Sequence, residues 1–130
     1  MAEFFRSECN RIFLAFDAIE YVRFGKDANK EQKVLVGMKS IDPQKKFFEV
    51  GYDVEYWPQL KELLSASNIM IELNDSIFVN GYTVNAFRYN EAKEEYDVYT
   101  SSGVEIGAWV KMDDPDRVFS EITKLRGLKL

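Results

Sequence analysis

The sequence of 130 residues contains no histidine and a single cysteine, Cys9. Without an imidazole there is no histidine general base, no Ser-His or Cys-His nucleophile pair and no histidine metal ligand. The sequence also has no glycine-rich phosphate loop followed by Lys and then Ser or Thr. We therefore predict a protein that is not an enzyme and that has no metal site and no cofactor.

Long apolar runs and disulfide pairs are absent as well. One cysteine cannot form an intramolecular disulfide, which favours a reducing compartment. The N-terminal stretch has no apolar run longer than Ile12–Phe16, which is too short for the core of a signal peptide. Nothing approaches the roughly 18 apolar residues that cross a bilayer. These absences predict a cytoplasmic protein without membrane contact.

Basic charge is scarce, with 17 Lys and Arg against 22 Asp and Glu, a net charge of -5 at pH 7. Residues 1–65 hold 10 basic and 11 acidic groups, whereas residues 66–130 hold 7 and 11. Because Lys and Arg supply most of the affinity for phosphate, this balance predicts that nucleic acid is a poor partner. The same acidic field would speed association with a basic protein partner.

The residues that are abundant indicate a β-rich domain, since 46% are apolar and 15% are aromatic, with only 7 Gly and 3 Pro. Alternating apolar positions such as Val34, Val36 and Met38 predict antiparallel strands with one buried face. The Asn80-Gly81 pair predicts a tight turn with positive φ. The predicted strands lie near residues 3–8, 12–15, 18–24, 33–39, 46–52, 69–73, 76–79, 82–89, 95–100 and 104–112.

Two helices are predicted, one after each group of strands. The first covers about residues 56–65, with Leu60, Leu63 and Leu64 on one side. The second covers residues 115–126, with Asp114 as its N-cap, Pro115 in its first turn and Gly127 at its end. Its apolar face consists of Val118, Phe119, Ile122 and Leu125.

The chain resembles itself when it is shifted by 65 residues. Ile12 to Leu14 then meet Ile77 to Val79, Ile19 meets Val84, and Val22 to Phe24 meet Phe87 to Tyr89, without a gap over 21 residues. A chance match of two amphipathic strands is the alternative explanation. We predict a single compact domain, residues 1–130, made of two pseudo-repeats, 1–65 and 66–130. Each is a small antiparallel β unit followed by a covering helix, which places the fold in the mainly β, α+β class.

Aromatic side chains are more numerous than one small core requires, and Tyr and Trp are frequent anchors of interfaces. Packing beneath the helices is the better explanation for any single one of them, whereas the set as a whole favours a contribution to an interface. In the acidic second half, these aromatics together with exposed carboxylates form the candidate partner-binding set, which consists of Tyr82, Tyr89, Tyr96, Tyr99, Trp109, Asp75 and Glu95.

The sequence shows two family resemblances, and the first is carried by the second half of the chain. The run from Ile71 to Asn80, then Val84, the run from Tyr99 to Gly103, and Asp114-Pro115 with Val118 resemble small bacterial and phage β-proteins that include the flagellar FlbD type. That resemblance implies a small accessory protein without catalytic residues.

The second resemblance is to the LytTR-type DNA-binding domain of bacterial response regulators, and it runs from end to end. It rests on Ile19 to Val22, Phe47 to Val50, the helix with Leu60, Leu63 and Leu64, and Asp75 to Asn80. It implies a DNA-facing loop before Ser76, where family members carry basic or neutral polar residues. Here Glu72, Asn74 and Asp75 stand in that loop, and Lys111 alone lies near a later basic position.

The charge balance decides between these interpretations at the level of sequence. We predict a non-catalytic protein-interaction module, such as an inhibitor, immunity or accessory protein of bacterial or phage origin. Its predicted partner is a protein, with a basic protein favoured and a homodimer left open. The alternative is a LytTR-like DNA-binding transcriptional regulator.

Overall fold

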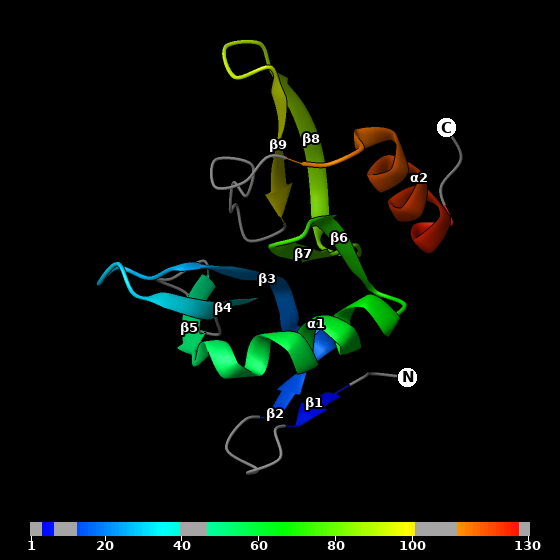
Figure 1. Cartoon of the computed structure of the whole chain (residues 1–130). Helices are drawn as coiled ribbons and strands as arrows, with labels where there is room; N and C mark the ends of the chain where they lie inside the picture. Colours follow the sequence, from blue (N-terminus) through cyan, green and yellow to red (C-terminus); the bar gives the residue numbers. More distant parts are fainter. Residues whose placement is uncertain (1–3, 7–12, 40–46, 101–111, 128–130) are drawn as a thin grey trace.

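The computed structural model of the chain describes residues 4–6, 13–39, 47–100 and 112–127, and its strands form three antiparallel sheets (Figure 1). A two-stranded sheet pairs β1 (Phe4–Arg6) with β2 (Phe13–Ala15), and another pairs β8 (Val84–Asn90) with β9 (Glu95–Thr100). The central sheet has the order β5-β4-β3-β7-β6. Its strands are β3 (Ile19–Lys26), β4 (Gln32–Lys39), β5 (Phe47–Tyr52), β6 (Met70–Asn74) and β7 (Ile77–Asn80).

Two α-helices accompany the sheets, α1 (Trp57–Ala66) and α2 (Pro115–Arg126). Short 3-10 turns, η1 (Phe16–Ala18) and η2 (Val54–Tyr56), precede β3 and α1. This composition confirms the predicted mainly β, α+β class. None of the helices in the described ranges is long and apolar enough to cross a membrane.

The first core cluster lies between the central sheet and α1. Val22, Val36 and Phe78 are buried on this side of the sheet, and Leu60 and Leu64 of α1 pack against them. The spacing of four residues places Leu60 and Leu64 on one stripe of the helix. Leu63, which was expected to share that stripe, is 38% exposed because it is turned away from the sheet.

The second core cluster lies on the opposite side of the central sheet, between it, the β8–β9 pair and α2 (Figure 1). Two arginines of α2 tie the helix to both sheets. Arg117 donates to the Glu72 carbonyl of β6, and Arg126 donates to the Val84 carbonyl of β8, both at 2.6 Å. The apolar stripe of α2 is buried in this cluster through Val118 and Ile122, as the sequence pattern predicts.

The ends of α2 agree with the sequence prediction. Asp114 Oδ1 accepts a hydrogen bond from the Arg117 backbone N–H at 3.3 Å, and Gly127 adopts the left-handed conformation that ends the helix. Asp114 itself has a φ of 44°, a conformation that Asp and Asn tolerate better than other side chains.

We expect Asp114→Ala to destabilise the protein by about 1 kcal/mol or more, because it removes the cap and leaves a poorly suited residue at positive φ. Asp114→Asn keeps both properties and should change the free energy of unfolding little. Urea denaturation followed by circular dichroism measures both variants. Equal losses for the two variants would show that the cap does not stabilise this helix.

The strand order of the two halves agrees with the predicted shift of 65 residues, but their pairing differs. The shift takes β1, β2 and β3 onto β6, β7 and β8, and Ile19 and Val84, which it superposes, are both buried. However, β3 pairs with β7 in the central sheet, whereas β8 pairs with β9 in a separate sheet. The pair Ile12 and Ile77 involves a residue outside the described ranges. The pseudo-repeat within one compact domain stays a prediction.

Candidate functional site

Asp75 lies exposed in the turn between β6 and β7, beside the hairpin that β3 and β4 form. The Ser76 N–H donates to the Asn74 side-chain oxygen at 2.7 Å, which fixes the turn. The Ser76 carbonyl accepts from the backbone N–H of Phe24 in β3, also at 2.7 Å. The turn named by sequence reasoning is therefore adjacent to the outer half of the β3–β4 hairpin.

Residues 24–33 of this hairpin, which we call the β3–β4 arm, begin where Phe24 stacks on Trp57 and end in a tip that projects away from the rest of the protein (Figure 1). The tip of the arm is ordered by Asp27, whose Oδ1 accepts from the N–H groups of Asn29 and Glu31 at 2.8 and 3.0 Å. Two backbone bonds, from Asp27 to the Glu31 carbonyl and from Lys30 to the Asp27 carbonyl, close the loop. The arm is a two-stranded ribbon with a defined tip.

Three lysines lie on the arm, and they differ in whether a carboxylate lies close to the ammonium group. Lys33 is 3.3 Å from an Asp53 oxygen and 4.0 Å from a Glu31 oxygen. Lys26 and Lys30 are exposed, and neither has a carboxylate partner within the described residues. Sequence reasoning did not single out this segment. Its lysines escaped notice because the charges of residues 1–65 nearly cancel when they are summed.

A row of three residues across neighbouring strands holds the base of the arm. Tyr21 of β3 faces Gly37 of β4, which in turn faces Glu49 of β5. A Cβ atom on Gly37 would lie 2.0 Å from the Tyr21 ring, so the ring passes directly over the glycine. The Tyr21 hydroxyl donates to Glu49, and Arg23 donates to both oxygens of that carboxylate at 3.1 Å.

Burial first, and then the bond to Glu49, raise the pKa of the Tyr21 phenol well above its ordinary value. The phenol therefore remains a hydrogen-bond donor at physiological pH. Because a charged acceptor strengthens such a bond, the row fixes three strands relative to each other.

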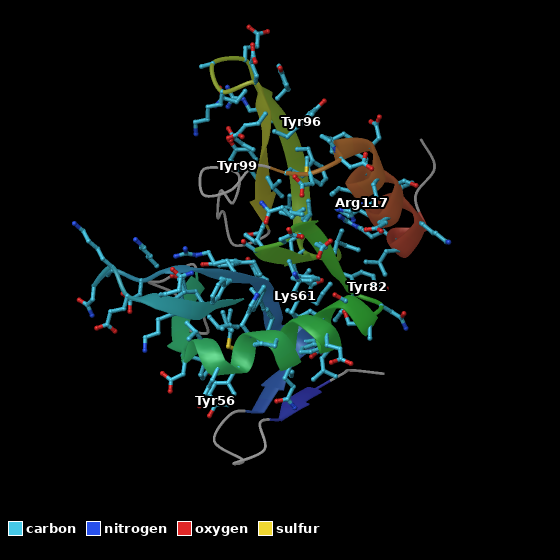
Figure 2. All side chains as sticks on the ribbon, in the orientation of Figure 1. Tyr56, Lys61, Tyr82, Tyr96, Tyr99 and Arg117 are labelled. Carbon is cyan, nitrogen blue, oxygen red and sulfur yellow. The ribbon has the colours of Figure 1, made fainter. Side chains whose placement is uncertain are left out.

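The candidate tyrosines of the β8–β9 pair lie on opposite faces (Figure 2). Tyr96 is half-buried, with its ring centre 5.2 Å from those of Tyr89 and Phe119. Tyr99 lies on the other face, in a polar hollow with Arg88 and Asp97. Tyr89 contacts Tyr96 and also lines this hollow, but Tyr96 and Tyr99 themselves lie on separate faces of the strand pair.

The remaining candidates are dispersed. Tyr82 is 54% exposed in the turn before β8, where its N–H donates to the Asn80 side chain, so β8 begins two residues later than predicted. Glu95 lies at the start of β9, opposite Asn90. Trp109 lies outside the described residues, as does Lys111. None of these residues adjoins Asp75 through a contact that the structure describes.

Comparison with known proteins bears on the fold. No protein-family model matches the chain, and no curated protein matches it. Among solved structures, the chain is similar to a LytTr DNA-binding domain from Bacillus cereus, described as part of a methyl-accepting/DNA response regulator. The match covers 98% of this chain and 97% of that one, with a TM-score of 0.54 and 18% sequence identity. This agreement over the whole of both chains shows a shared fold.

The comparison corrects one prediction and changes the weight of another. The expectation that nucleic acid is a poor partner is contradicted, because this fold is used by a DNA-binding domain. The error came from applying the net charge of the whole chain to an interface that only part of the surface would form. The comparison favours the LytTR-like alternative and gives no support to a protein-interaction module. The FlbD-type resemblance stays a prediction.

Proposed function

We propose that the chain is a DNA-binding module of the LytTr structural type, and that it serves as a transcriptional regulator. The observation that carries the proposal is the similarity to a DNA-binding domain along the whole length of both chains. Fold similarity alone does not fix function, so the local chemistry of the surface has to agree with it.

The β3–β4 arm supplies that chemistry. A two-stranded β-ribbon fits the major groove of B-form DNA. The arm presents Lys26 and Lys30 without carboxylate partners among the described residues, so both ammonium groups are available to phosphates. The Ser76 carbonyl joins the β6–β7 turn to the arm, and we infer that the two approach the duplex together.

The acidic character of the rest of the chain limits how much affinity phosphate contacts can add. The logarithm of the association constant falls linearly with the logarithm of salt concentration, and each neutralised phosphate makes this slope more negative by about 0.9. With two arm lysines and few other cations nearby, the slope should be shallow, between about -2 and -4. Sequence specificity would then depend on contacts to base edges from the arm and the turn.

Selection from a random duplex pool, followed by fluorescence anisotropy with the selected duplex, tests the proposal. We expect a specific duplex to be enriched at about 50 mM salt and its affinity to fall as salt rises to about 200 mM. Asp75→Asn removes a negative charge beside the duplex and should tighten binding. If no duplex is retained even at the lowest salt concentration, the proposed function is wrong.

A further inference from the structure

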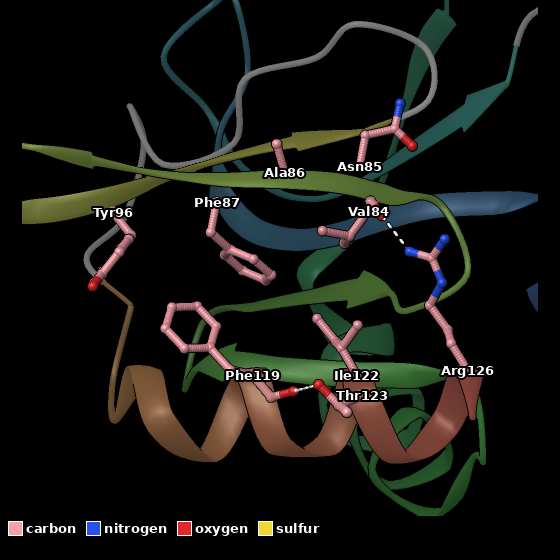
Figure 3. A pocket seen from close by; sticks show the side chains of 9 residues that line it. All are labelled: Val84, Asn85, Ala86, Phe87, Tyr96, Phe119, Ile122, Thr123 and Arg126. Atoms are coloured by element: carbon pink, nitrogen blue, oxygen red, sulfur yellow. Dashed lines mark hydrogen bonds between the residues drawn. The ribbon is translucent and has the colours of Figure 1, made fainter. Parts of the chain in front are cut away.

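An apolar cavity of about 440 Å³ lies between β8 and α2 (Figure 3), which are on the side of the protein away from the β3–β4 arm (Figure 1). Its wall is formed by Val84 and Phe87 of β8 and by Phe119 and Ile122 of α2, with Tyr96 at one end. The volume falls within the range of about 300 to 1,000 Å³ that is typical of small-molecule sites. The rings of Phe87 and Phe119 pack edge to face, with their centres 4.7 Å apart, so they present aromatic edges and faces to the cavity.

The cavity has few polar groups, and only one of the described side chains that line it carries a charge. Arg126 lies at the end opposite Tyr96 and is the one charged side chain among the described residues that line the space (Figure 3). One of its terminal nitrogens donates to the Val84 carbonyl at 2.6 Å, which holds the guanidinium in place. Arg126 forms no ion pair with the described carboxylates.

A guanidinium has five N–H donors in a planar fork, and the bond to Val84 occupies one of the two terminal nitrogens. The remaining edge of the fork matches the two oxygens of a carboxylate. An apolar wall with one fixed cation at its end therefore selects a ligand that is apolar at one end and anionic at the other.

We infer that this cavity is a binding site for a small aromatic carboxylate. The aromatic part of the ligand packs edge to face against Phe87 and Phe119, and its carboxylate pairs with Arg126. The side chain of Thr123 does not compete for the ligand, because its hydroxyl donates to the Phe119 carbonyl at 2.7 Å. The inference does not rest on the proposed DNA binding, since no residue of the arm lines the cavity.

The test compares 2-naphthoate with its neutral analogue 2-naphthamide in a titration of the full chain, followed by amide NMR shifts. We expect 2-naphthoate to bind with a dissociation constant of about 1 mM, a value set by its size. The shifted amides should include those of Phe87, Phe119 and Thr123. The amide analogue should bind about tenfold more weakly, because it lacks the charge-assisted bond.

Two variants test separately what the apolar space and the charge of Arg126 contribute to binding. Arg126→Gln should weaken 2-naphthoate about tenfold and leave 2-naphthamide unchanged, whereas Thr123→Trp should fill the space and abolish both. Lys124→Gln, the same charge change on α2 at a side chain that does not line the cavity, is the control and should leave both affinities unchanged. Should Arg126→Gln fail to fold, the comparison of acid and amide in the unmodified protein decides. Equal affinity for the two ligands, shifts away from β8 and α2, or no shifts at about 10 mM ligand would overturn the inference.

Discussion

Replacing Gly37 by Ala is expected to destabilise the protein by about 3 kcal/mol or more, although alanine adds only one carbon atom. The new Cβ would lie 2.0 Å from the Tyr21 ring, which fills the space above the glycine. The ring is fully buried and has to move, and its hydroxyl then loses the bond to Glu49. Overpacking costs about 1 to 3 kcal/mol, and a bond to a charged acceptor contributes about 1.5 to 3 kcal/mol.

The neighbouring strand β5 supplies the control for this experiment. Gly51 of β5 has Leu35 as its nearest neighbour, at 3.5 Å from an added Cβ, which is an ordinary contact. Gly51→Ala should therefore be neutral or stabilise the protein by up to about 1 kcal/mol, since alanine loses less conformational entropy in a strand. In a Tyr21→Ala background, Gly37→Ala should cost little. A large cost in that background would show that the ring is not the obstacle. Chemical denaturation at equilibrium measures all four proteins.

The double variant Lys26→Glu/Lys30→Glu is expected to weaken DNA binding by about 10- to 100-fold at about 100 mM salt. Both side chains are exposed on the β3–β4 arm, and neither has a carboxylate partner among the described residues. The loss of two phosphate contacts should also make the salt dependence shallower by about 2 in slope. Fluorescence anisotropy over a series of salt concentrations gives both quantities.

A matched control makes the same change in net charge at two lysines outside the β3–β4 arm. Lys93 in the β8–β9 loop and Lys124 on α2 are also exposed, so Lys93→Glu/Lys124→Glu makes the protein more acidic by the same amount. If the arm contacts the duplex, this control should weaken binding only slightly. Equal losses for both double variants would mean that only the overall charge matters and that the arm is not the interface. Denaturation curves establish that both variants are folded.

The positions of most strands and of α2 could be predicted because their causes are local. The range 115–126 predicted for α2 agrees with the observed Pro115–Arg126, since the cap, the first-turn proline and the terminal glycine are all read from neighbouring residues. The reason predicted for the glycine at position 81 was wrong. Gly81 does not have a positive φ. Instead, an added Cβ there would lie 2.5 Å from Leu125 of α2, so the glycine is needed for close packing across the core.

Net charge and aromatic content favoured a protein-interaction module over the LytTR-like alternative that the structural comparison favours, for a similar reason. Both are sums over the chain, whereas an interface is a local arrangement. Asp75 was singled out from its place in the sequence, but nothing in the sequence placed its turn beside Phe24, at the base of the β3–β4 arm. The bond from Phe24 to the Ser76 carbonyl, which joins residues 52 positions apart, creates that neighbourhood.

The sequence by itself determined the secondary structure, the α+β class and the absence of histidine chemistry, because periodicity, caps and residue types depend on neighbours along the chain. The tertiary structure decided which strands pair. It placed β7 beside β3, brought the Tyr21 ring across Gly37 to Glu49, and set Lys26 and Lys30 on the β3–β4 arm. These features depend on contacts between residues far apart in the chain, whose register is fixed only when both faces of the central sheet are buried.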